Sequence, residues 1–209
     1  MHTLTLTPPA RTKTTTSIII GDGIIASTDA KFCVSTILRA DSFDRIVLLF
    51  DAGIQSIAQR IQTSLPSTVS ISVASGDASK SLAEVERITT LMLDAGCTRK
   101  TLLVCVGGGM LTDLGGFIAS VFMRGIPCVL VPTSLLGMVD AAIGGKTAVN
   151  AGGRKNMIGT VTHPVSVIVD TALLKALPEA QFSEGLVEVI KIAAIVDRPF
   201  FEWLEENIA

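Results

Sequence analysis

Lysines and glycines that could bind an anion are set in an apolar part of the chain between residues 140 and 158. Lys146 follows two glycines and Lys155 precedes Asn156, with isoleucine, valine and methionine around them. A charge in apolar surroundings costs free energy unless it is paired, hydrated or facing a ligand. Glycine amides and lysine ammonium groups together make a cradle for anions. We expect Asp140, Lys146, Lys155 and Asn156 to line such a site; ordinary solvated lysines are the alternative.

A run of three glycines follows the apolar segment TLLVCV and opens a helical pattern. Gly107, Gly108 and Gly109 would let backbone amides approach a pyrophosphate at the start of that helix. The third glycine of the usual dinucleotide fingerprint is replaced by Thr112, so a tight strand–helix turn is the alternative. Asp113 lies one helical turn further on, where it either caps the helix or binds a cofactor hydroxyl or amide.

Two further loops carry polar groups that suit a nucleotide. In SGDASKS, Asp77 and Lys80 follow another apolar segment, so they either contact the same nucleotide or act as a helix cap and a solvated lysine. Thr133 and Ser134 follow VLVP and either cap a helix or contact the ribose or nicotinamide.

A very apolar helical pattern near the end of the sequence carries charges on one face. Glu184, Glu188 and Lys191 are spaced to share that face. A buried carboxylate needs a cation, so Glu188 pairs either with Lys191 or with a divalent metal. One carboxylate is too few for a metal site, and the sequence places His163 in a surface loop rather than beside Glu188.

The arrangement of apolar runs predicts an α/β fold with a Rossmann-like, mostly parallel sheet, followed by the start of an α-helical domain. Apolar runs such as IVLLF do not alternate with polar residues, which indicates strands covered on both faces. We expect one helix from Ser79, its cap, to Ala95, stopped by Gly96. The expected strands are Ser17–Ile20, Arg45–Phe50, Val69–Ala74, Thr101–Val106, Pro127–Val131 and Val165–Val169.

Composition excludes two classes of partner. A net charge of −2, with no Tyr and one Trp, argues against a nucleic-acid surface. Apolar runs are broken before they reach the roughly 18 to 20 residues that a membrane helix needs. Four scattered cysteines favour a reducing compartment, hence the cytoplasm, with Cys105 and Cys128 as small buried hydrophobes.

The sequence divides into three parts. Residues 1–16 lack an apolar signal core and are expected to form a flexible arm. Residues 17–177 form the nucleotide-binding α/β domain, and 178–209 begin a helical domain. Phe182–Val196 is apolar nearly all round, so it needs cover on several sides that the few residues after it cannot supply. We therefore expect the chain to be a fragment or a truncated gene product.

Taken together, these segments are similar to the 3-dehydroquinate synthase family and its sugar-phosphate cyclase relatives. The matching pieces cover roughly residues 17 to 209 in the family's order and spacing. They are SGDASK, GGGMLTD, FMRG, VPTSLLGMVDAAIGGKTAVN, GRKNMIG and LVEVIK.

The resemblance implies a carbon–oxygen lyase with tightly bound NAD and one divalent metal, Zn²⁺ or Co²⁺. Its substrate would be 3-deoxy-arabino-heptulosonate 7-phosphate, a phosphorylated sugar acid. The products would be 3-dehydroquinate and phosphate, on the shikimate route to aromatic amino acids. The resemblance also implies a homodimer.

The resemblance assigns roles residue by residue. Arg124 resembles an arginine that reaches the substrate phosphate in the neighbouring subunit, and Glu188 resembles the single carboxylate metal ligand. Substrate-site residues would be Asp140, Lys146, Lys155, Asn156 and Lys191, with Lys146 and Asn156 near the phosphate. NAD contacts would be Asp51, Asp77, Lys80, Gly108, Gly109, Asp113, Thr133, Ser134 and Leu173, Leu174, Lys175 and Ala176.

Departures from the family pattern leave alternatives open. The family usually has Glu where Asp77 stands, and often Asn where Gly53 stands, so one adenosine contact is in doubt. The family's two histidine metal ligands would lie beyond Ala209, so we expect the 209-residue chain alone to be inactive. The alternatives are a 2-epi-5-epi-valiolone synthase-like cyclase, a metal-dependent alcohol or glycerol dehydrogenase, and an NAD-binding fragment without catalysis.

Overall fold

The structure, a computed structural model, describes residues 15–27, 34–65 and 68–208 and is built on a six-stranded parallel sheet. Every strand pair in this sheet is parallel, which confirms the predicted fold class. Central strands are apolar throughout and buried on both faces, as in other parallel sheets. In spatial order the strands are β1 (Ser17–Gly21), β8 (Ser166–Asp170), β5 (Cys128–Pro132), β4 (Thr101–Gly107), β2 (Arg45–Asp51) and β3 (Thr68–Val73).

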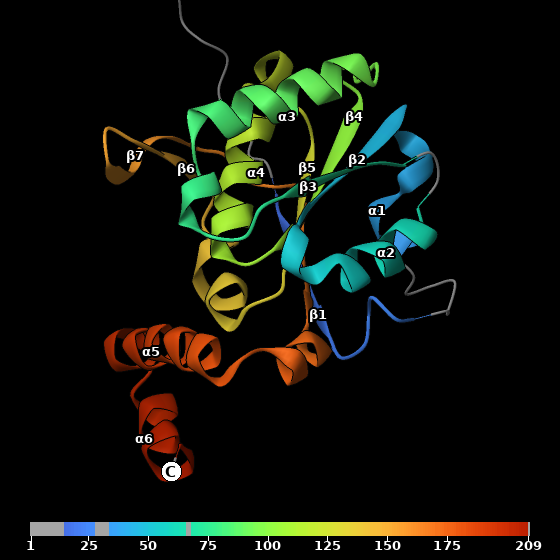
Figure 1. Ribbon diagram of the computed structural model, residues 1–209. Coiled ribbons are helices and arrows are strands. Elements are labelled where there is room, and N and C mark those ends of the chain that lie inside the picture. The colour runs from blue at the N-terminus through green and yellow to red at the C-terminus, as the bar shows by residue number, and fades with distance from the viewer. Residues whose placement is uncertain (1–14, 28–33, 66–67, 209) are drawn as a thin grey trace, which may run out of the picture.

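Helices cover both faces of the sheet (Figure 1). α3 (Leu82–Asp94) and α4 (Gly109–Val121) pack on one face and form a core with Val47, Leu49 and Cys105. α1 (Val34–Leu38) and α2 (Gln55–Thr63) pack on the other face. Short helical turns connect the elements: η1 (Ala40–Ser42), η2 (Ala52–Ile54), η3 (Asp77–Ser79), η4 (Phe122–Arg124), η5 (Gly137–Ala141, π-helical) and η6 (Thr171–Ala176).

The predicted end of helix α3 is confirmed, whereas its predicted start is wrong. α3 ends as expected, with Gly96 at φ +72°, where a glycine is unstrained. Its start was predicted wrongly at Ser79. The cap is Ser81, whose Oγ accepts from the Glu84 backbone N–H at 3.2 Å, because residues 77–79 form a separate turn first.

An antiparallel hairpin, which the sequence analysis did not predict, stands beside the sheet. β6 (Lys146–Ala151) and β7 (Arg154–Val161) are joined by Gly152–Gly153, both at positive φ, which is the usual geometry of a two-residue hairpin turn. The glycine pair between two β-prone segments was the missed signal. The expected anion cradle is therefore built on a hairpin rather than on a loop.

Helix α4 lies between β4 and this hairpin, and two of its glycines make that position possible. A Cβ on Gly115 would lie 2.2 Å from Cys105 Sγ, and one on Gly116 would lie 2.6 Å from Thr147 Cγ2. Close helix–strand packing, the task of the third fingerprint glycine that Thr112 replaces, is thus performed by residues one turn later.

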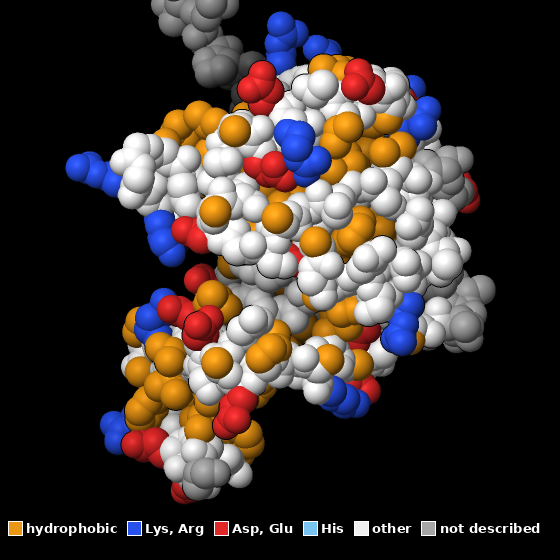
Figure 2. Space-filling view, in the orientation of Figure 1, with side chains coloured by type: hydrophobic (Ala, Val, Ile, Leu, Met, Phe, Trp, Pro, Cys, Tyr) orange, Lys and Arg blue, Asp and Glu red, His pale blue; other side chains and the backbone are white. Residues whose placement is uncertain are grey.

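The last two helices project from the sheet region at the lower end of Figure 1. α5 (Glu179–Val196) approaches the 134–141 turn so closely that a Cβ on Gly185 would lie 2.6 Å from the Leu136 backbone nitrogen. α6 (Arg198–Asn207) packs on α5. Val187, Ile195 and Val196 remain 62%, 72% and 74% exposed, and apolar side chains gather on this part of the surface in Figure 2. The composition of this helix requires cover on several sides, and the described residues do not provide that cover.

Other expectations have mixed outcomes. Cys105 and Cys128 are buried and free, as predicted, whereas Cys33 lies outside the described residues. Most of the expected arm also lies outside them, but Thr16 at its end donates a hydrogen bond to the Pro164 carbonyl at 2.7 Å. Among the described residues no helix combines the length and the hydropathy needed to span a bilayer.

Candidate functional site

The carboxyl ends of β2 and β4 form the natural crevice of this sheet. From β2 the chain continues to β3 at one edge of the sheet, and then returns to add β4 and β5 on the other side of β2. The order in which successive strands are added to the sheet therefore reverses between β2 and β4. Ligands of open α/β sheets bind where the strand order reverses. Asp51 ends β2 and the triple glycine ends β4, so the expected nucleotide residues flank this crevice.

The glycine turn leaves room for a ligand at the start of α4. Gly108 is the N-cap and no side chain caps this helix end, so its first amides remain for a partner. A Cβ on Gly108 would lie 3.4 Å from Ser134 Oγ, and one on Gly109 would lie 3.2 Å from Ala141 Cβ. Larger side chains would fill this space, which fits a pyrophosphate held by backbone amides.

Asp51 and the residues around it are held in place by local bonds. Its Oδ1 accepts from the Gly53 N–H at 2.8 Å and from the Ser75 hydroxyl. Ser75 belongs to the loop after β3, so the polar ends of two neighbouring strands are joined at the crevice. Asp51 is half-buried at the end of its strand, and its bonds through Oδ1 leave Oδ2 for a ribose hydroxyl.

A cavity of about 620 Å³ lies beside the glycine turn. Three of the expected substrate residues line it, Asp140, Lys146 and Asn156, together with Asp113, an expected NAD contact. Asp113 comes from α4, Asp140 from the π-helical turn, and Lys146 and Asn156 from the two strands of the hairpin. Ala141, which lines the cavity, also faces Gly109. Lys146 therefore lines a cavity whose wall at Ala141 lies against the glycine turn.

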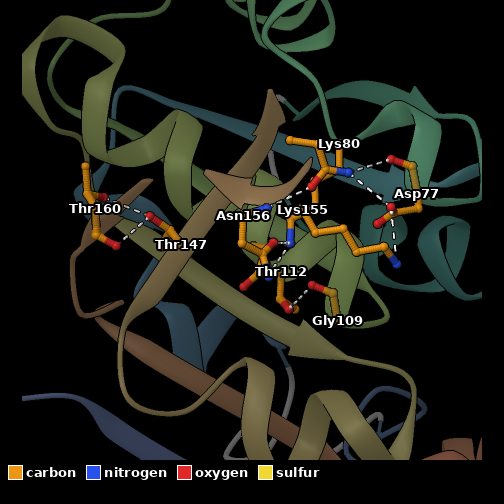
Figure 3. Close-up of polar contacts among 10 residues, drawn as sticks. Asp77, Lys80, Gly109, Thr112, Thr147, Lys155, Asn156 and Thr160 are labelled. Carbon is orange, nitrogen blue, oxygen red and sulfur yellow. Dashed lines mark hydrogen bonds and ion pairs between the residues drawn. The ribbon is translucent and has the colours of Figure 1, made fainter. Parts of the chain in front are cut away.

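Lys80 is the buried cation of this site, and its alternative interpretation as a solvated lysine is wrong. The residue is 5% exposed, and Nζ donates to Asp113 Oδ2 at 2.5 Å and to Asn156 Oδ1 (Figure 3). Sequence spacing alone could not show this, because Lys80 is 33 residues from Asp113 and 76 from Asn156.

The Asp113 carboxyl has a raised pKa, chiefly because burial disfavours its charged form. The Lys80 ammonium opposes this shift, and the negative charge of Asp140 adds to it. Both aspartates line the same cavity. Asp113 is thus fixed inside the protein rather than serving as a surface cap.

Lys155 is placed differently from Lys146 and Asn156. It is not among the residues that line the cavity, and its Nζ lies 3.4 Å from Asp77 Oδ2, with the lysine side chain 76% exposed. Figure 3 shows Lys155 reaching across to Asp77 on the loop after β3. An expected substrate residue is therefore paired with an expected cofactor residue.

One residue that the sequence analysis passed over joins these groups. Asn150, near the end of β6, accepts from the Asn156 backbone N–H at 3.0 Å and donates to Asp77 Oδ2 at 3.1 Å. Its position in KTAVN was visible, but nothing in the sequence indicated its partners.

The remaining expected cofactor residues lie along the same edge of the sheet. The Thr133 N–H donates to the Gly107 carbonyl at 2.9 Å, and Ser134 Oγ caps the following turn at Gly137. Ser134 thus matches the capping alternative, whereas the Thr133 bond is made by its backbone rather than by its hydroxyl. Leu173 and Leu174 pack on the core, whereas Lys175 and Ala176 are exposed.

A buried aspartate that the sequence analysis missed holds the 173–176 turn. The Asp170 carboxylate is 1% exposed and accepts from the backbone N–H groups of Gly23, Ile25 and Ala172 at 2.7, 2.9 and 3.1 Å. Three amide donors satisfy a buried carboxylate without a cation, so this residue has a structural role.

Glu188 and Lys191 form an ion pair on α5, as one of the two sequence alternatives predicted. Glu188 Oε2 is buried, and the Lys191 ammonium lies directly against it. The Lys191 pKa is raised, mainly by its contact with Glu188 and also by Asp140. α5 packs against the Gly137–Ala141 turn, which carries Asp140 into the cavity wall. No group of three or more potential metal ligands occurs among the described residues.

Arg124 lies away from these groups. It lines a second cavity of about 1070 Å³ with His163 and Cys128, and it is exposed. His163 is exposed too, which confirms the surface interpretation. Lys146 lines both cavities, so it stands between them.

Comparison with known proteins identifies the family. A family model described as 3-dehydroquinate synthase N-terminal matches residues 70–184, which contain the glycine turn, the hairpin and most of the cavity. The chain belongs to the 3-dehydroquinate synthase family. The 3-dehydroquinate synthase of Rhodopirellula baltica is 44% identical over 169 residues, which covers 78% of this chain and 45% of that protein. That of Blochmanniella floridana is 50% identical over 133 residues, or 64% of this chain and 36% of that protein. The chain therefore spans less than half the length of these relatives.

Solved structures of other sugar-phosphate cyclases have the same fold. The 2-epi-5-epi-valiolone synthase of Streptomyces hygroscopicus, solved with NAD⁺ and Zn²⁺ bound, superimposes with a TM-score of 0.83 at 26% identity, covering 97% of this chain and 56% of that one. A 2-deoxy-scyllo-inosose synthase complexed with carbaglucose-6-phosphate, NAD⁺ and Co²⁺ gives 0.74 at 27% identity, covering 83% and 48%. A probable glycerol dehydrogenase from Sinorhizobium meliloti, at 22% identity, covers 78% and 41% and shares the fold alone, with a TM-score of 0.58.

Proposed function

We propose that this chain is the nucleotide- and phosphate-binding part of a 3-dehydroquinate synthase. The reaction would convert 3-deoxy-arabino-heptulosonate 7-phosphate into 3-dehydroquinate and phosphate. The observation that carries the proposal is the cavity beside the glycine turn, where Asp113, Asp140, Lys146 and Asn156 converge. Family membership supplies the reaction, and the cavity supplies groups that suit its phosphorylated substrate.

NAD would occupy the crevice at the reversal of strand order. The uncapped start of α4 at Gly108 and Gly109 would bind the pyrophosphate, and Asp51 would accept hydrogen bonds from a ribose. Asp77 and Thr133 lie along the same edge. The remaining contacts proposed on this edge are Lys80, Asp113, Ser134 and Leu173 to Ala176. Cyclase structures solved with NAD⁺ bound support NAD as the cofactor.

The substrate would lie in the cavity, with its phosphate between Lys146 and Asn156. The ammonium group and the side-chain amide would neutralise and orient a leaving phosphate, an interaction that strengthens as negative charge develops. Asp140, with Lys191 beside it, would face the ring hydroxyls from the opposite wall. Lys155 would join this set once its contact with Asp77 is exchanged for a substrate oxygen.

Glu188 would supply one ligand to a divalent metal. Its Oε2 is buried and lies against the Lys191 ammonium, so this carboxylate already holds positive charge at the position that a metal ion would take. Zn²⁺ or Co²⁺ would stabilise alkoxide charge there, and NAD would accept and return a hydride. One carboxylate is an incomplete set, because tight sites take three or four protein ligands.

We also propose a domain division at residue 177, a homodimer and a cytoplasmic location. Arg124 lines the second cavity rather than the first, which fits a residue that serves the site of a neighbouring subunit. The three described cysteines are free, which suits a reducing compartment.

Another sugar-phosphate cyclase is the second candidate. Two cyclases with other names share the fold at 26% and 27% identity, with their own NAD⁺ and metal. Chromatographic identification of the product formed from 3-deoxy-arabino-heptulosonate 7-phosphate or sedoheptulose 7-phosphate by a preparation that turns over would separate the two candidates.

NAD⁺ binding by the purified chain, measured by isothermal titration calorimetry, tests the proposal. The variant compared with the unsubstituted chain is Gly108→Val, whose side chain would fill the space proposed for the pyrophosphate. Gly108 has φ −73°, which any residue adopts, and a Cβ there meets Ser134 Oγ at a normal 3.4 Å. This variant should fold, with an unchanged circular dichroism spectrum, and lose NAD⁺ binding. Absent binding by the unsubstituted chain, or equal binding by both proteins, would overturn the assignment.

Turnover is a separate measurement. We expect the 209-residue chain with NAD⁺ and Zn²⁺ or Co²⁺ to release no phosphate from 3-deoxy-arabino-heptulosonate 7-phosphate, because Glu188 has no co-ligands among the described residues. Release of phosphate would refute that expectation.

A further inference from the structure

The loop after β3 and the tip of the hairpin meet through polar contacts. Asn150 on β6 donates its backbone N–H to the Lys80 carbonyl at 2.8 Å and forms a bridge with Ser81. From the tip, Lys155 contacts Asp77 and Asn156 contacts Lys80. The cofactor edge and the substrate hairpin are thus joined at one seam.

The Asn150 side chain uses both of its ends in this seam. Nδ2 donates to Asp77 Oδ2 at 3.1 Å and to the Asp77 carbonyl at 3.3 Å, while Oδ1 accepts from the Asn156 N–H at 3.0 Å. The side-chain amide of Asn150 therefore connects the loop at Asp77, 73 residues away along the chain, with the strand at Asn156, 6 residues away.

The Asn156 backbone has a conformation that this contact holds. Its φ of +58° lies in the left-handed region, which asparagine enters more readily than most residues other than glycine. The side-chain oxygen Oδ1 of Asn150 accepts from the Asn156 backbone N–H and holds it in that conformation. Lys80 then holds Asn156 Oδ1, so the other end of the amide, Nδ2, remains as a donor on the cavity wall.

The base of the hairpin is anchored independently. Val149 is completely buried, and Thr147 and Thr160 bond to each other at 2.8 Å (Figure 3). The Thr160 hydroxyl also bonds to Ser120 on α4 at 2.8 Å. Loss of the Asn150 side chain should therefore free the tip without unfolding the base.

We propose that Asn150 is a positioning residue that holds Asn156 on Lys80 and so orients the Asn156 amide toward the substrate phosphate. The positioning of Asn156 follows from the contacts alone, whereas the link to phosphate rests on the proposed function. Asn150 does not line the cavity, so its effect would act through Asn156.

The first test is the hydrogen-exchange rate of the Asn156 amide, measured by NMR on the purified chain. Asn150→Ala should accelerate exchange at residues 155–157 by about tenfold, since each lost hydrogen bond is worth on the order of 1 kcal/mol. Asn207→Ala is the matched control, because it removes the same side chain, bonded to the Trp203 carbonyl in α6, far from the hairpin. It should leave these rates unchanged.

A reciprocal exchange separates positioning from general loosening. Asn150→Asp places two carboxylates against each other and should also accelerate exchange at the tip. Adding Asp77→Asn restores one donor and one acceptor and should bring the rates back to within about twofold of the unsubstituted chain. Unchanged rates in Asn150→Ala, or no recovery in the double variant, would overturn the proposal.

The second test measures inorganic phosphate binding in the presence of saturating NAD⁺. Asn150→Ala should weaken phosphate binding by about tenfold with NAD⁺ affinity and melting temperature little changed. If phosphate affinity is unaffected while exchange accelerates, Asn150 positions the tip without serving the phosphate, and the link is refuted. If the unsubstituted chain binds neither NAD⁺ nor phosphate, the proposed function fails, and the exchange measurements still decide the role of Asn150.

Discussion

The wall of the cavity and the tip of the hairpin each hold a lysine against an aspartate, in opposite environments. Lys80 and Asp113 have side chains that are 6% and 19% exposed, with 2.5 Å between Nζ and Oδ2. Lys155 and Asp77 are 76% and 49% exposed, with 3.4 Å between their charged atoms. The same chemical pair is thus part of the interior in one region and a solvated surface contact in the other.

This difference separates fixed charges from available ones. A buried pair is strongly coupled, because removal of one partner leaves an uncompensated charge in a poorly polarisable medium. An exposed pair contributes little, since water and salt screen it. Lys80 is therefore committed to shaping the site, whereas Lys155 can leave Asp77 for a ligand at low cost.

The largest effect is expected for Lys80→Met, which keeps the length of the side chain and removes its charge. The buried Asp113 carboxylate would lose its cation, and the free energy of unfolding should fall by about 3–5 kcal/mol. Urea unfolding followed by circular dichroism measures this change. A loss below about 1 kcal/mol would mean that the two lysine pairs are energetically alike.

Gly116→Ala should come next, because it tests whether the wall that carries Asp113 can move. A Cβ there would lie 2.6 Å from Thr147 Cγ2, and overpacking of this kind costs about 1–3 kcal/mol. Adding Thr147→Ser removes that methyl group and keeps the hydroxyl, so it should restore most of the lost stability. Failure of this rescue in thermal melts would show that the clash is not the cause.

The pH dependence of stability should differ between Asp113 and its neutral analogue. Because burial raises the Asp113 pKa above 3.8, the folded protein retains this proton over a range where the unfolded chain has lost it. The resulting stabilisation is present below about pH 4 and is lost as pH rises through the folded-state pKa. Relative to Asp113→Asn, the unsubstituted chain should therefore lose stability as pH rises above 3.8.

Urea midpoints of the two proteins, compared at several pH values, measure this effect. If the urea midpoint of the unsubstituted chain instead rises relative to that of Asp113→Asn as pH increases, the attraction of Lys80 outweighs the effect of burial. That result would contradict the raised pKa of Asp113.

The smallest stability effect is expected for Lys155→Met. An exposed pair contributes at most about 1 kcal/mol, so the urea midpoint should hardly move, and 1 M salt should remove any remaining difference. Phosphate binding should nevertheless weaken, because Lys155 is proposed to reach the substrate. A large loss of stability would place this lysine with Lys80 and remove the contrast between the two regions.

Much of the fold was predictable from short segments. The six strands of the parallel sheet were predicted within about one residue. The four inner strands, β8, β5, β4 and β2, are apolar runs buried for most of their length, whereas the edge strands β1 and β3 are partly exposed. The hairpin was missed because its strands are polar and exposed on one side, so the apolar pattern that marks the others is weak. Its glycine pair was the one local signal, and it was interpreted as part of an anion cradle.

The candidate site was predictable as a list of residues and much less as an arrangement. Asp140, Lys146 and Asn156 meet in the cavity as expected, while Lys155 turns to Asp77. Asn150 was missed, because an asparagine in a strand carries no local sign of its partners.

The sequence by itself determined the strands, the glycine turn and the family, because each depends on residues that are adjacent along the chain. Tertiary structure alone decided which lysine is buried and which carboxylate it meets. Lys80, Asp113 and Asn156 come from three elements, and their charges interact only after folding brings these elements within hydrogen-bond distance. The strength of that interaction depends on burial, a property of the packed molecule that local sequence does not carry.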